Sequence, residues 1–217
     1  HYPLRRQRQM CIRDRWDEAL KRDAAGRKKE LSEEIGWIES RRGDMLGFWS
    51  KVEEGTIPTR VTHNDTKINN ILFDRQGEVL CAIDLDTVMA STSLNDFGDA
   101  IRSYANTGDE DDRDLSRVGL SLEMFRAYTE GYLSQRAKQL TDSEIDHLAF
   151  SARYITFEQV LRFLMDYIDG DTYYKVKYPG HNLVRTHAQY RLLQSMEEHY
   201  GEMCRIVRET VDKYRKA

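Results

Sequence analysis

The chain has 217 residues, three widely spaced cysteines and a formal net charge of −4. The acidic balance argues against nucleic-acid binding, which usually requires a basic footprint, and the cysteines form neither a disulfide framework nor a Cys-x-x-Cys zinc site. Because no apolar run approaches the ~20 residues that span a bilayer, we expect a soluble cytoplasmic protein with a sizeable core in one or two domains.

Residues 1–15 do not resemble the start of a domain. They are rich in arginine, begin without a methionine and show neither the helical nor the strand period. We interpret them as a non-native tail of the kind that adapter sequence adds, and we assign residues 16–217 to the domain itself. A native basic tail is the alternative.

Residues 17–54 are predicted to be helical. Their composition is charged, and apolar residues recur at mostly helical intervals, at Leu31, Ile35, Ile38, Met45, Phe48 and Val52. The segment Arg42-Gly43-Asp44 is expected to divide this region into two helices. A turn follows at 55–58.

The stretch 63–86 carries the strongest chemical signal in the chain. Two short apolar runs, 71–73 and 79–83, flank a polar segment that contains a glycine, which is the pattern of a β-hairpin. Paired strands lie about 4.8 Å apart. The hairpin is therefore expected to bring Asn70, before its first strand, beside Asp84, after its second.

Asn70 and Asp84 are candidate ligands of Mg²⁺. This ion usually takes only one or two protein carboxylates, prefers oxygen ligands and leaves its other positions to water and phosphate. A further carboxylate, Asp65, precedes Asn70 by five residues and can accept a proton from an attacking hydroxyl. The sequence therefore predicts a magnesium site beside a general base.

The order of these groups resembles a known enzyme superfamily. Asp65-x4-Asn70, followed by a hairpin and then Ile83-Asp84, is similar to the catalytic and metal-binding loops of the aminoglycoside phosphotransferase and choline kinase superfamily, whose members are relatives of the protein kinases.

Three segments are most similar to the N-acetylhexosamine 1-kinase branch of that superfamily. They read HNDTKINN at 63–70, IDLDTVM at 83–89 and DFGDAIR at 96–102. Aminoglycoside kinases usually carry His-Gly-Asp and Ile-Asp-Trp-Glu at the corresponding places. This chain has Asn64 for the glycine and Leu85-Asp86 for Trp-Glu, which favours a sugar kinase.

The resemblance implies a fold and a reaction. The fold would be α+β, the mainly helical C-terminal lobe of a kinase-like enzyme with a small β-hairpin at the catalytic and metal site. The reaction would be ATP- and Mg²⁺-dependent phosphoryl transfer to a small-molecule hydroxyl, and the branch implies the anomeric hydroxyl of an N-acetylhexosamine.

The resemblance also implies roles for individual residues. Asp65 would orient the hydroxyl and take its proton, while Asn70 and Asp84 would hold Mg²⁺ against the β- and γ-phosphates. Asp86 would contribute to a second metal or to the sugar site. Lys67 would steady developing charge or lie on the surface, and His63 would brace the loop rather than transfer protons.

No nucleotide-binding lobe is evident in the sequence. Before residue 60 there is no Gly-x-Gly-x-x-Gly, no Gly-x4-Gly-Lys-Ser/Thr and no strand with a buried-looking lysine. In kinase-like enzymes a small β-rich lobe supplies these parts, which cover and grip the phosphates. We therefore expect the chain to be a C-terminal fragment that is a poor catalyst, or none, by itself.

The letters Asp-Phe-Gly at 96–98 are not interpreted as the protein-kinase metal motif, because Asp84 already has that role. Asp96 is instead expected to cap a helix or to pin a loop, and Asp99 can face the site. The acidic run at 108–112 lacks the residue spacing of a calcium loop. It is interpreted as a solvated loop.

The C-terminal half is predicted to be helical. Helices are expected over 121–136 and 142–168, and the apolar face of the second is broad enough for a central, mostly buried helix. A turn is expected at 178–181. A last helix over 183–214 carries a stripe of apolar residues suited to packing.

Arg162 lies on the otherwise apolar part of the central helix, where burial is costly unless the charge is paired or used. The resemblance to hexosamine kinases implies that Arg162 and Tyr173 contact the sugar, through hydrogen bonds and ring stacking. An ion pair with Asp166, four residues further along the helix, is the alternative.

Three other functions fit parts of the sequence. The acceptor can be another small alcohol, such as choline, an aminoglycoside or homoserine. A cationic acceptor needs an acidic or aromatic cage, and the acidic run at 108–112 is expected to lie too far from the site. A helical module that binds a sugar or a partner protein without catalysis is a candidate from another class, and a metal-dependent hydrolase is a weak third.

Overall fold

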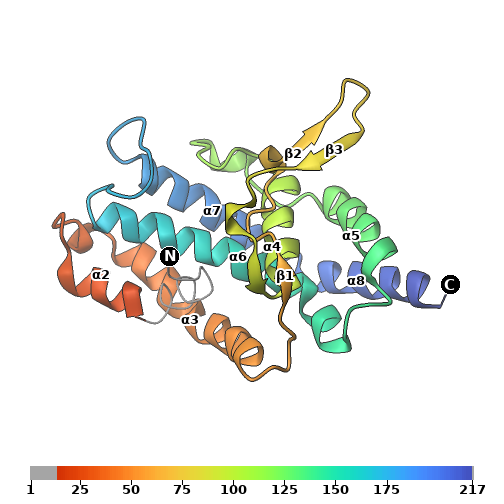
Figure 1. Ribbon diagram of the computed structural model, residues 1–217. Helices are drawn as coiled ribbons and strands as arrows, with labels where there is room; N and C mark the ends of the chain where they lie inside the picture. Colours follow the sequence, from red (N-terminus) through yellow and green to blue (C-terminus); the bar gives the residue numbers. More distant parts are fainter. Residues whose placement is uncertain (1–13, 217) are drawn as a thin grey trace.

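The structure, a computed structural model, describes residues 14–216. The predicted non-native tail therefore lies outside the described residues, apart from its last two positions. Figure 1 shows a mainly helical body from which one hairpin projects. The helices are α2 (Trp16–Arg22), α3 (Ser32–Glu53), α4 (Ser93–Tyr104), α5 (Leu122–Arg136), α6 (Asp142–Ile168), α7 (His181–Glu198) and α8 (Tyr200–Arg215).

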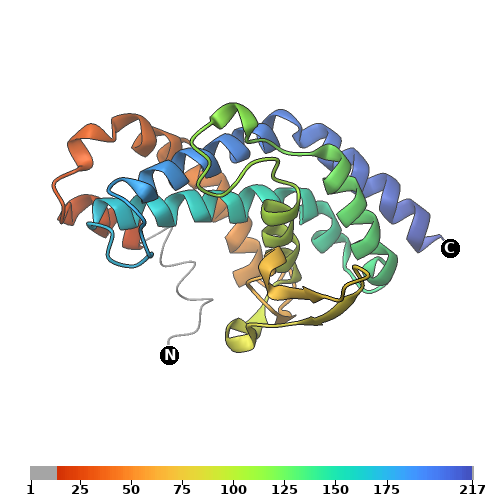
Figure 2. The ribbon, with the colours of Figure 1, turned by 90° about the horizontal axis from the view of Figure 1, so that it is seen from above.

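Helix α6 is the centre of the body, as its broad apolar face predicted. It begins with a capping box in which Thr141 and Glu144 exchange hydrogen bonds, and most of its residues are buried. Helix α7 runs beside it in both ribbon views (Figures 1 and 2), and α2, α3, α4 and α8 also pack against it. The core therefore surrounds one long helix.

Helix α4 approaches α6 more closely than a side chain would permit. A Cβ placed on Gly98 would lie 2.4 Å from the carbonyl oxygen of Ser151 in α6. This glycine therefore allows the two backbones to meet. The close approach fixes the position of α4, which carries one wall of the site.

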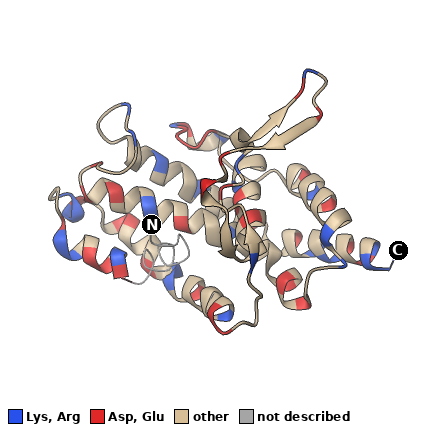
Figure 3. Ribbon diagram, in the orientation of Figure 1, with Lys and Arg blue, Asp and Glu red and all other residues tan. Residues whose placement is uncertain are grey.

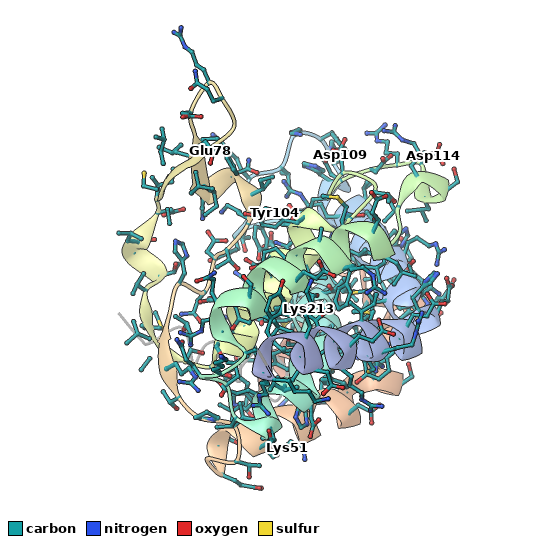
Figure 4. The ribbon with its side chains drawn as sticks, turned by 90° about the vertical axis from the view of Figure 1, so that its right-hand side faces the viewer. Lys51, Glu78, Tyr104, Asp109, Asp114 and Lys213 are labelled. Atoms are coloured by element: carbon teal, nitrogen blue, oxygen red, sulfur yellow. The ribbon has the colours of Figure 1, made fainter. Side chains whose placement is uncertain are left out.

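Two small antiparallel sheets complete the fold. Strand β1 (Arg60–Thr62) pairs with β4 (Met89–Ser91), and β2 (Ile71–Phe73) pairs with β3 (Val79–Ala82). The second pair is the predicted hairpin, and Glu78, near its tip, lies far from the helical body in Figure 4. The structure is α+β, as predicted. Its assignment to the C-terminal lobe of a kinase-like fold stays a prediction.

Two helix boundaries differ from the sequence prediction. The break expected at residues 42–44 is wrong, because α3 runs through Gly43 without interruption. An exposed glycine costs a helix only about 1 kcal/mol, and the buried side chains of Met45 and Phe48 hold this one in place. The actual break lies at 23–31, where Asp23 and Gly26 have left-handed backbones.

The single helix predicted over 183–214 is also wrong. It is divided into α7 and α8 at His199, whose backbone has φ −101° and ψ 10°. The backbone N–H of His199 donates to the carbonyl oxygen of Ser195 at 3.1 Å, and the ring Nδ1 contacts the same oxygen at 2.8 Å. A side chain that competes for a helix carbonyl in this way favours the end of a helix.

The described residues before Arg60 contain helices and turns but no strand. None of the helices in residues 14–216 combines the length and apolar character that crossing a membrane requires.

The buried carboxylate of Glu144 ties three elements together. It accepts hydrogen bonds from Arg60 of β1 at 2.6 and 2.7 Å, from Ser93 of α4 at 2.7 Å, and from the backbone N–H of Thr141 at 2.8 Å. Burial would raise the pKa of Glu144, but the hydrogen bonds from Arg60, Thr141 and Ser93 outweigh it and lower the pKa to about 2.

We expect Glu144 to make the free energy of unfolding depend on pH. The lowered pKa stabilises the folded protein above the ordinary value of 4.5, and that stability is lost as pH falls towards about 2. The difference corresponds to roughly 3 kcal/mol. Urea unfolding of Glu144→Gln should therefore show a loss of this size at pH 7 and a weaker dependence on pH between 4.5 and 2.

Asp142→Asn is the matched control, because the side chain of Asp142 is 87% exposed and pairs only with Arg215 in the described part of the chain. This variant should lose less than about 1 kcal/mol. An equal loss in both variants, or an unchanged pH dependence in Glu144→Gln, would contradict the assigned role of Glu144.

Candidate active site

The loop that carries Asp65 is held against the start of α4 by Asp96. The carboxylate of Asp96 accepts the backbone N–H of His63 at 2.9 Å and that of Asn64 at 2.7 Å. The helix itself is capped by Thr92. Of the two roles expected for Asp96, loop pinning is therefore confirmed, and capping belongs to Thr92.

Two further contacts lay this loop along one face of α4. The hydroxyl of Thr66 donates to the carbonyl oxygen of Asp96 at 2.6 Å, and the hydroxyl of Ser103 accepts the backbone N–H of Ile68 at 3.1 Å. Positions 96 and 103 are two turns apart on the same face of a helix. The loop therefore follows α4 from its first turn to its last.

The open end of the hairpin meets the same loop. The backbone N–H of Ile83 donates to the carbonyl oxygen of Asn70 at 2.9 Å, and His63 Nε2 lies 3.0 Å from the carbonyl oxygen of Ile83. The hydroxyl of Thr87 donates to the carbonyl oxygen of His63 at 2.6 Å. The structure thus places Asn70 beside Ile83, the residue before its expected neighbour Asp84, and the contacts of His63 brace the loop.

The carboxylate of Asp65 has one oxygen engaged and one open. Asp65 Oδ2 accepts from Lys67 Nζ at 2.7 Å and from Asn70 Nδ2 at 2.9 Å. Asn70 Nδ2 also donates to the carbonyl oxygen of Asp65 at 2.9 Å. In the described residues no donor reaches Asp65 Oδ1, which leaves it able to accept a proton, and the amide oxygen of Asn70 is turned away from Asp65.

Asp84 and Asp86 are exposed and stand at the open end of the hairpin. Asp84 has a left-handed backbone with φ 64°, and it opens the short 3₁₀ turn Leu85–Thr87. Their carboxylates make no hydrogen bond or ion pair with residues 14–216. Within the same residues, no group of three His, Cys, Asp or Glu side chains is placed to hold a metal ion. Two carboxylates and an amide oxygen are a donor set that fits Mg²⁺, which keeps water and phosphate as its other ligands.

A cavity of about 690 Å³ opens beside Asp65. Its walls come from the loop that carries Asp65, from α4 and the loop after it, from α6, from residues 173–174 and from α7. They include Lys67, Arg162 and Tyr173. The volume lies in the range of small-molecule sites. The structure therefore brings two of the predicted sugar contacts to the same cavity as the predicted base, whereas His63, Asn70, Asp84 and Asp86 lie outside its lining.

Arg162 and Tyr173 are neighbours in this cavity. The guanidinium of Arg162 lies 5.9 Å from the ring centroid of Tyr173 and 5.5 Å from that of Tyr174. Asp166, the alternative partner of Arg162, accepts the backbone N–H groups of residues 172–174 at 2.8 to 2.9 Å. Asp166 therefore holds the loop that presents Tyr173 to the cavity.

Contrary to the sequence prediction, the acidic run at 108–112 does not lie too far from the site, although its residues Asp109 and Glu110 are exposed to solvent as expected. Asp109 and Glu110 line the cavity. Glu110 pairs with Arg102 of α4 at 2.9 Å, and Asp111 contacts the buried ring of His181 at 2.7 Å, which lowers the pKa of Asp111. The prediction failed because both partners lie elsewhere in the chain and draw the loop against the cavity.

The pictures show the same arrangement from two sides. The red ribbon of the acidic loop lies at the same end of the molecule as the hairpin in Figure 3, and Figure 4 places Asp109 at the end that carries Glu78 and opposite Lys51. The hairpin and the acidic loop thus lie at one end of the helical body.

The wall supplied by α7 was not expected from the sequence. It contributes Arg185 and Gln189, which line the cavity together with Glu158 of α6 and with Asp99 and Arg102 of α4. Asp99 was expected to be able to face the site, and its place in the lining agrees with this. No pattern in the sequence pointed to Gln189, which precedes the apolar stripe of the last predicted helix.

Comparison with known protein families gives a match to this part of the chain. A family model described as the phosphotransferase enzyme family matches residues 3–132. This is more than half of the chain, and it includes the loop that carries Asp65, the hairpin and α4.

Proposed function

The chain belongs to the phosphotransferase enzyme family, whose enzymes transfer a phosphoryl group to a small-molecule hydroxyl, and we propose that its acceptor is the anomeric hydroxyl of an N-acetylhexosamine. ATP is the proposed donor and Mg²⁺ the proposed cofactor. The observation that carries the proposal is the open Oδ1 of Asp65, whose other oxygen, Oδ2, is held by Lys67 and Asn70. Asp65 lines a cavity that Arg162 and Tyr173 also line.

The proposed mechanism follows from the contacts of Asp65. Phosphoryl transfer has a loose transition state, so positioning and charge neutralisation supply most of the catalysis. Asp65 Oδ1 orients the acceptor hydroxyl and takes its proton. Lys67 and Asn70 hold the other oxygen of Asp65 and so fix the direction in which Oδ1 points.

Asn70 and Asp84 are the proposed ligands of Mg²⁺, which neutralises charge on the phosphates when it is bound. Their closeness through the Ile83–Asn70 backbone hydrogen bond supports this assignment. Asp86, two residues after Asp84, is proposed to contribute to a second metal or to the sugar site. His63 is proposed to act on the loop through the carbonyl oxygen of Ile83 and not on a proton.

A second candidate acceptor is a cationic alcohol, such as an aminoglycoside or choline. Asp109 and Glu110 in the cavity wall favour it, because carboxylates attract an ammonium group. The whole lining nevertheless has nearly balanced charge, which favours a neutral acceptor. Its acidic members are Asp65, Asp99, Asp109, Glu110 and Glu158, and its basic members are Lys67, Arg102, Arg162 and Arg185.

ADP release from ATP and Mg²⁺ by the complete gene product, measured over a panel of acceptors, distinguishes the candidates. We expect N-acetylglucosamine or N-acetylgalactosamine to accelerate ADP release more than choline, homoserine or kanamycin does. Acceleration by the cationic acceptors only would favour the second candidate. Sugar binding without acceleration by any acceptor would instead indicate a non-catalytic binding module.

We further propose that the groups that grip the nucleotide lie outside residues 14–216, so that these residues alone turn over ATP slowly or not at all. The helical character of the described residues before Arg60 supports this. The hairpin also exposes apolar side chains, with Val79 64% and Leu80 63% exposed, and such surfaces usually mark an interaction site. Comparing ADP release by the 217-residue chain and by the complete gene product tests the proposal.

A further inference from the structure

Among the buried polar atoms of the cavity wall that lack a hydrogen-bond partner within the described residues, two belong to the side chains of Asp99 in α4 and Gln189 in α7. Asp99 is 5% exposed and Gln189 is fully buried, and both side chains line the cavity. In the part of the chain that the structure describes, neither Asp99 Oδ2 nor Gln189 Nε2 has a hydrogen-bond partner. Buried polar groups are nearly always hydrogen-bonded, so two unmatched groups in one wall require an explanation.

Arg102 determines which atoms are left open. Its Nε donates to Asp99 Oδ1 at 3.0 Å, and its NH1 group lies 3.4 Å from Gln189 Oε1. The guanidinium therefore occupies one oxygen of each side chain. What remains is a hydrogen-bond acceptor on Asp99 and a hydrogen-bond donor on Gln189.

The open pair lies next to the catalytic loop. Asp99 is three residues after Asp96 and four before Ser103, and residues at this spacing share one face of a helix. Asp96 and Ser103 both contact the catalytic loop. A ligand group at Asp99 would therefore lie beside the loop that presents Asp65.

The two open atoms restrict the chemistry of a matching group. An ammonium group only donates and would leave Gln189 Nε2 unmatched, whereas a carboxylate only accepts and would leave Asp99 Oδ2 unmatched. A buried polar group that finds no partner in the complex loses its hydrogen bonds with water without replacement, and this desolvation free energy weakens binding. The pair therefore selects an uncharged group that both donates and accepts, either a hydroxyl or a secondary amide.

We propose that Asp99 and Gln189 form the subsite for the acylamino group of the acceptor, with the amide N–H donating to Asp99 Oδ2 and the amide oxygen accepting from Gln189 Nε2. The two open atoms belong to different helices and are separated by the guanidinium of Arg102. A secondary amide likewise carries its donor and its acceptor on two separate atoms, whereas a hydroxyl carries both on one oxygen. This subsite rests on the proposed sugar-kinase function, and Asp99 and Gln189 would be the residues that determine the specificity for the acceptor.

The test is the dissociation constant of three sugars, measured by calorimetry on the complete gene product without nucleotide. N-acetylglucosamine carries the amide, glucose a hydroxyl and glucosamine an ammonium at the same position. We expect N-acetylglucosamine to bind at least about tenfold more tightly than the other two, because only it satisfies both open atoms at their separate positions.

Gln189→Glu replaces the open donor by an acceptor with little change of shape. It should weaken the binding of N-acetylglucosamine by about tenfold or more while leaving that of glucosamine unchanged or tighter. Asp99→Asn, which exchanges the open acceptor for a donor, is the second variant and should also lose the preference for the amide. Gln194→Glu on the same helix is the matched control, because Gln194 is not among the cavity-lining residues.

Thermal unfolding of each variant checks that it is folded. Equal affinities for the three sugars in the unmodified protein would overturn the subsite, and so would an equal loss for all three in Gln189→Glu. Glucose binding as tightly as N-acetylglucosamine would overturn the acylamino assignment. Turnover in Asp65→Asn tests phosphoryl transfer without altering Asp99 or Gln189, so failure of the reaction and failure of the subsite are distinguishable.

Discussion

Asp65→Asn is expected to lower kcat by at least about a hundredfold in the complete enzyme, because general-base catalysis typically contributes a factor of 10² to 10⁴. Asparagine keeps the size of the side chain and one carbonyl oxygen, but it cannot take the proton of the acceptor hydroxyl. The contacts of Lys67 and Asn70 with Oδ2 fix the position of Asp65 and leave Oδ1 as the oxygen proposed for this role.

The measurement is steady-state turnover with saturating ATP and acceptor. The KM for the acceptor should change much less than kcat, because the sugar contacts proposed for Arg162 and Tyr173 are retained. Asp146→Asn is the control, since Asp146 is exposed on α6 and does not line the cavity. A kcat for Asp65→Asn within about tenfold of the unmodified enzyme would remove the base assignment.

Asp84→Ala is expected to abolish Mg²⁺-dependent turnover. A metal ion that neutralises phosphate charge contributes several kcal/mol, which corresponds to about a thousandfold in rate or more. The backbone of Asp84 is left-handed with φ 64°, a conformation that asparagine tolerates better than alanine does. Asp84→Asn therefore separates loss of the carboxylate from strain in the loop, and it should also lower the rate strongly.

The dependence of rate on Mg²⁺ concentration identifies the metal ligand. Any residual activity of the two variants should need much more Mg²⁺ to reach half of its maximum. Asp86→Ala is the neighbouring comparison, and a smaller effect there would agree with a contribution to a second metal or to the sugar. An unchanged Mg²⁺ dependence in Asp84→Ala would move the metal site to other residues.

The local parts of the site were predictable from the sequence. The hairpin followed from a polar, glycine-containing turn between two apolar runs, and its pairing placed Asn70 beside Ile83. Asp74 shows why this turn is local, since its carboxylate accepts the backbone N–H groups of Gln76 and Glu78. Interactions within a few residues leave a readable pattern in the sequence.

The rest of the cavity depends on contacts between distant residues. Asp111 meets His181 from 70 positions away, and Arg102 meets Gln189 from 87 positions away. A charge pattern does not reveal such partners, so the acidic run was expected to lie too far from the site. The continuous helix through Gly43 has a similar cause, because the buried neighbours Met45 and Phe48 outweigh a weak local signal.

Phosphorus NMR of the complete enzyme with ATP, Mg²⁺ and N-acetylglucosamine tests the central claim most directly. The account predicts that the γ-phosphorus signal of ATP is replaced by that of a phosphate ester at the anomeric carbon, and that Asp65→Asn suppresses this signal. Release of inorganic phosphate only, or ester formation that is undiminished in Asp65→Asn, would contradict it.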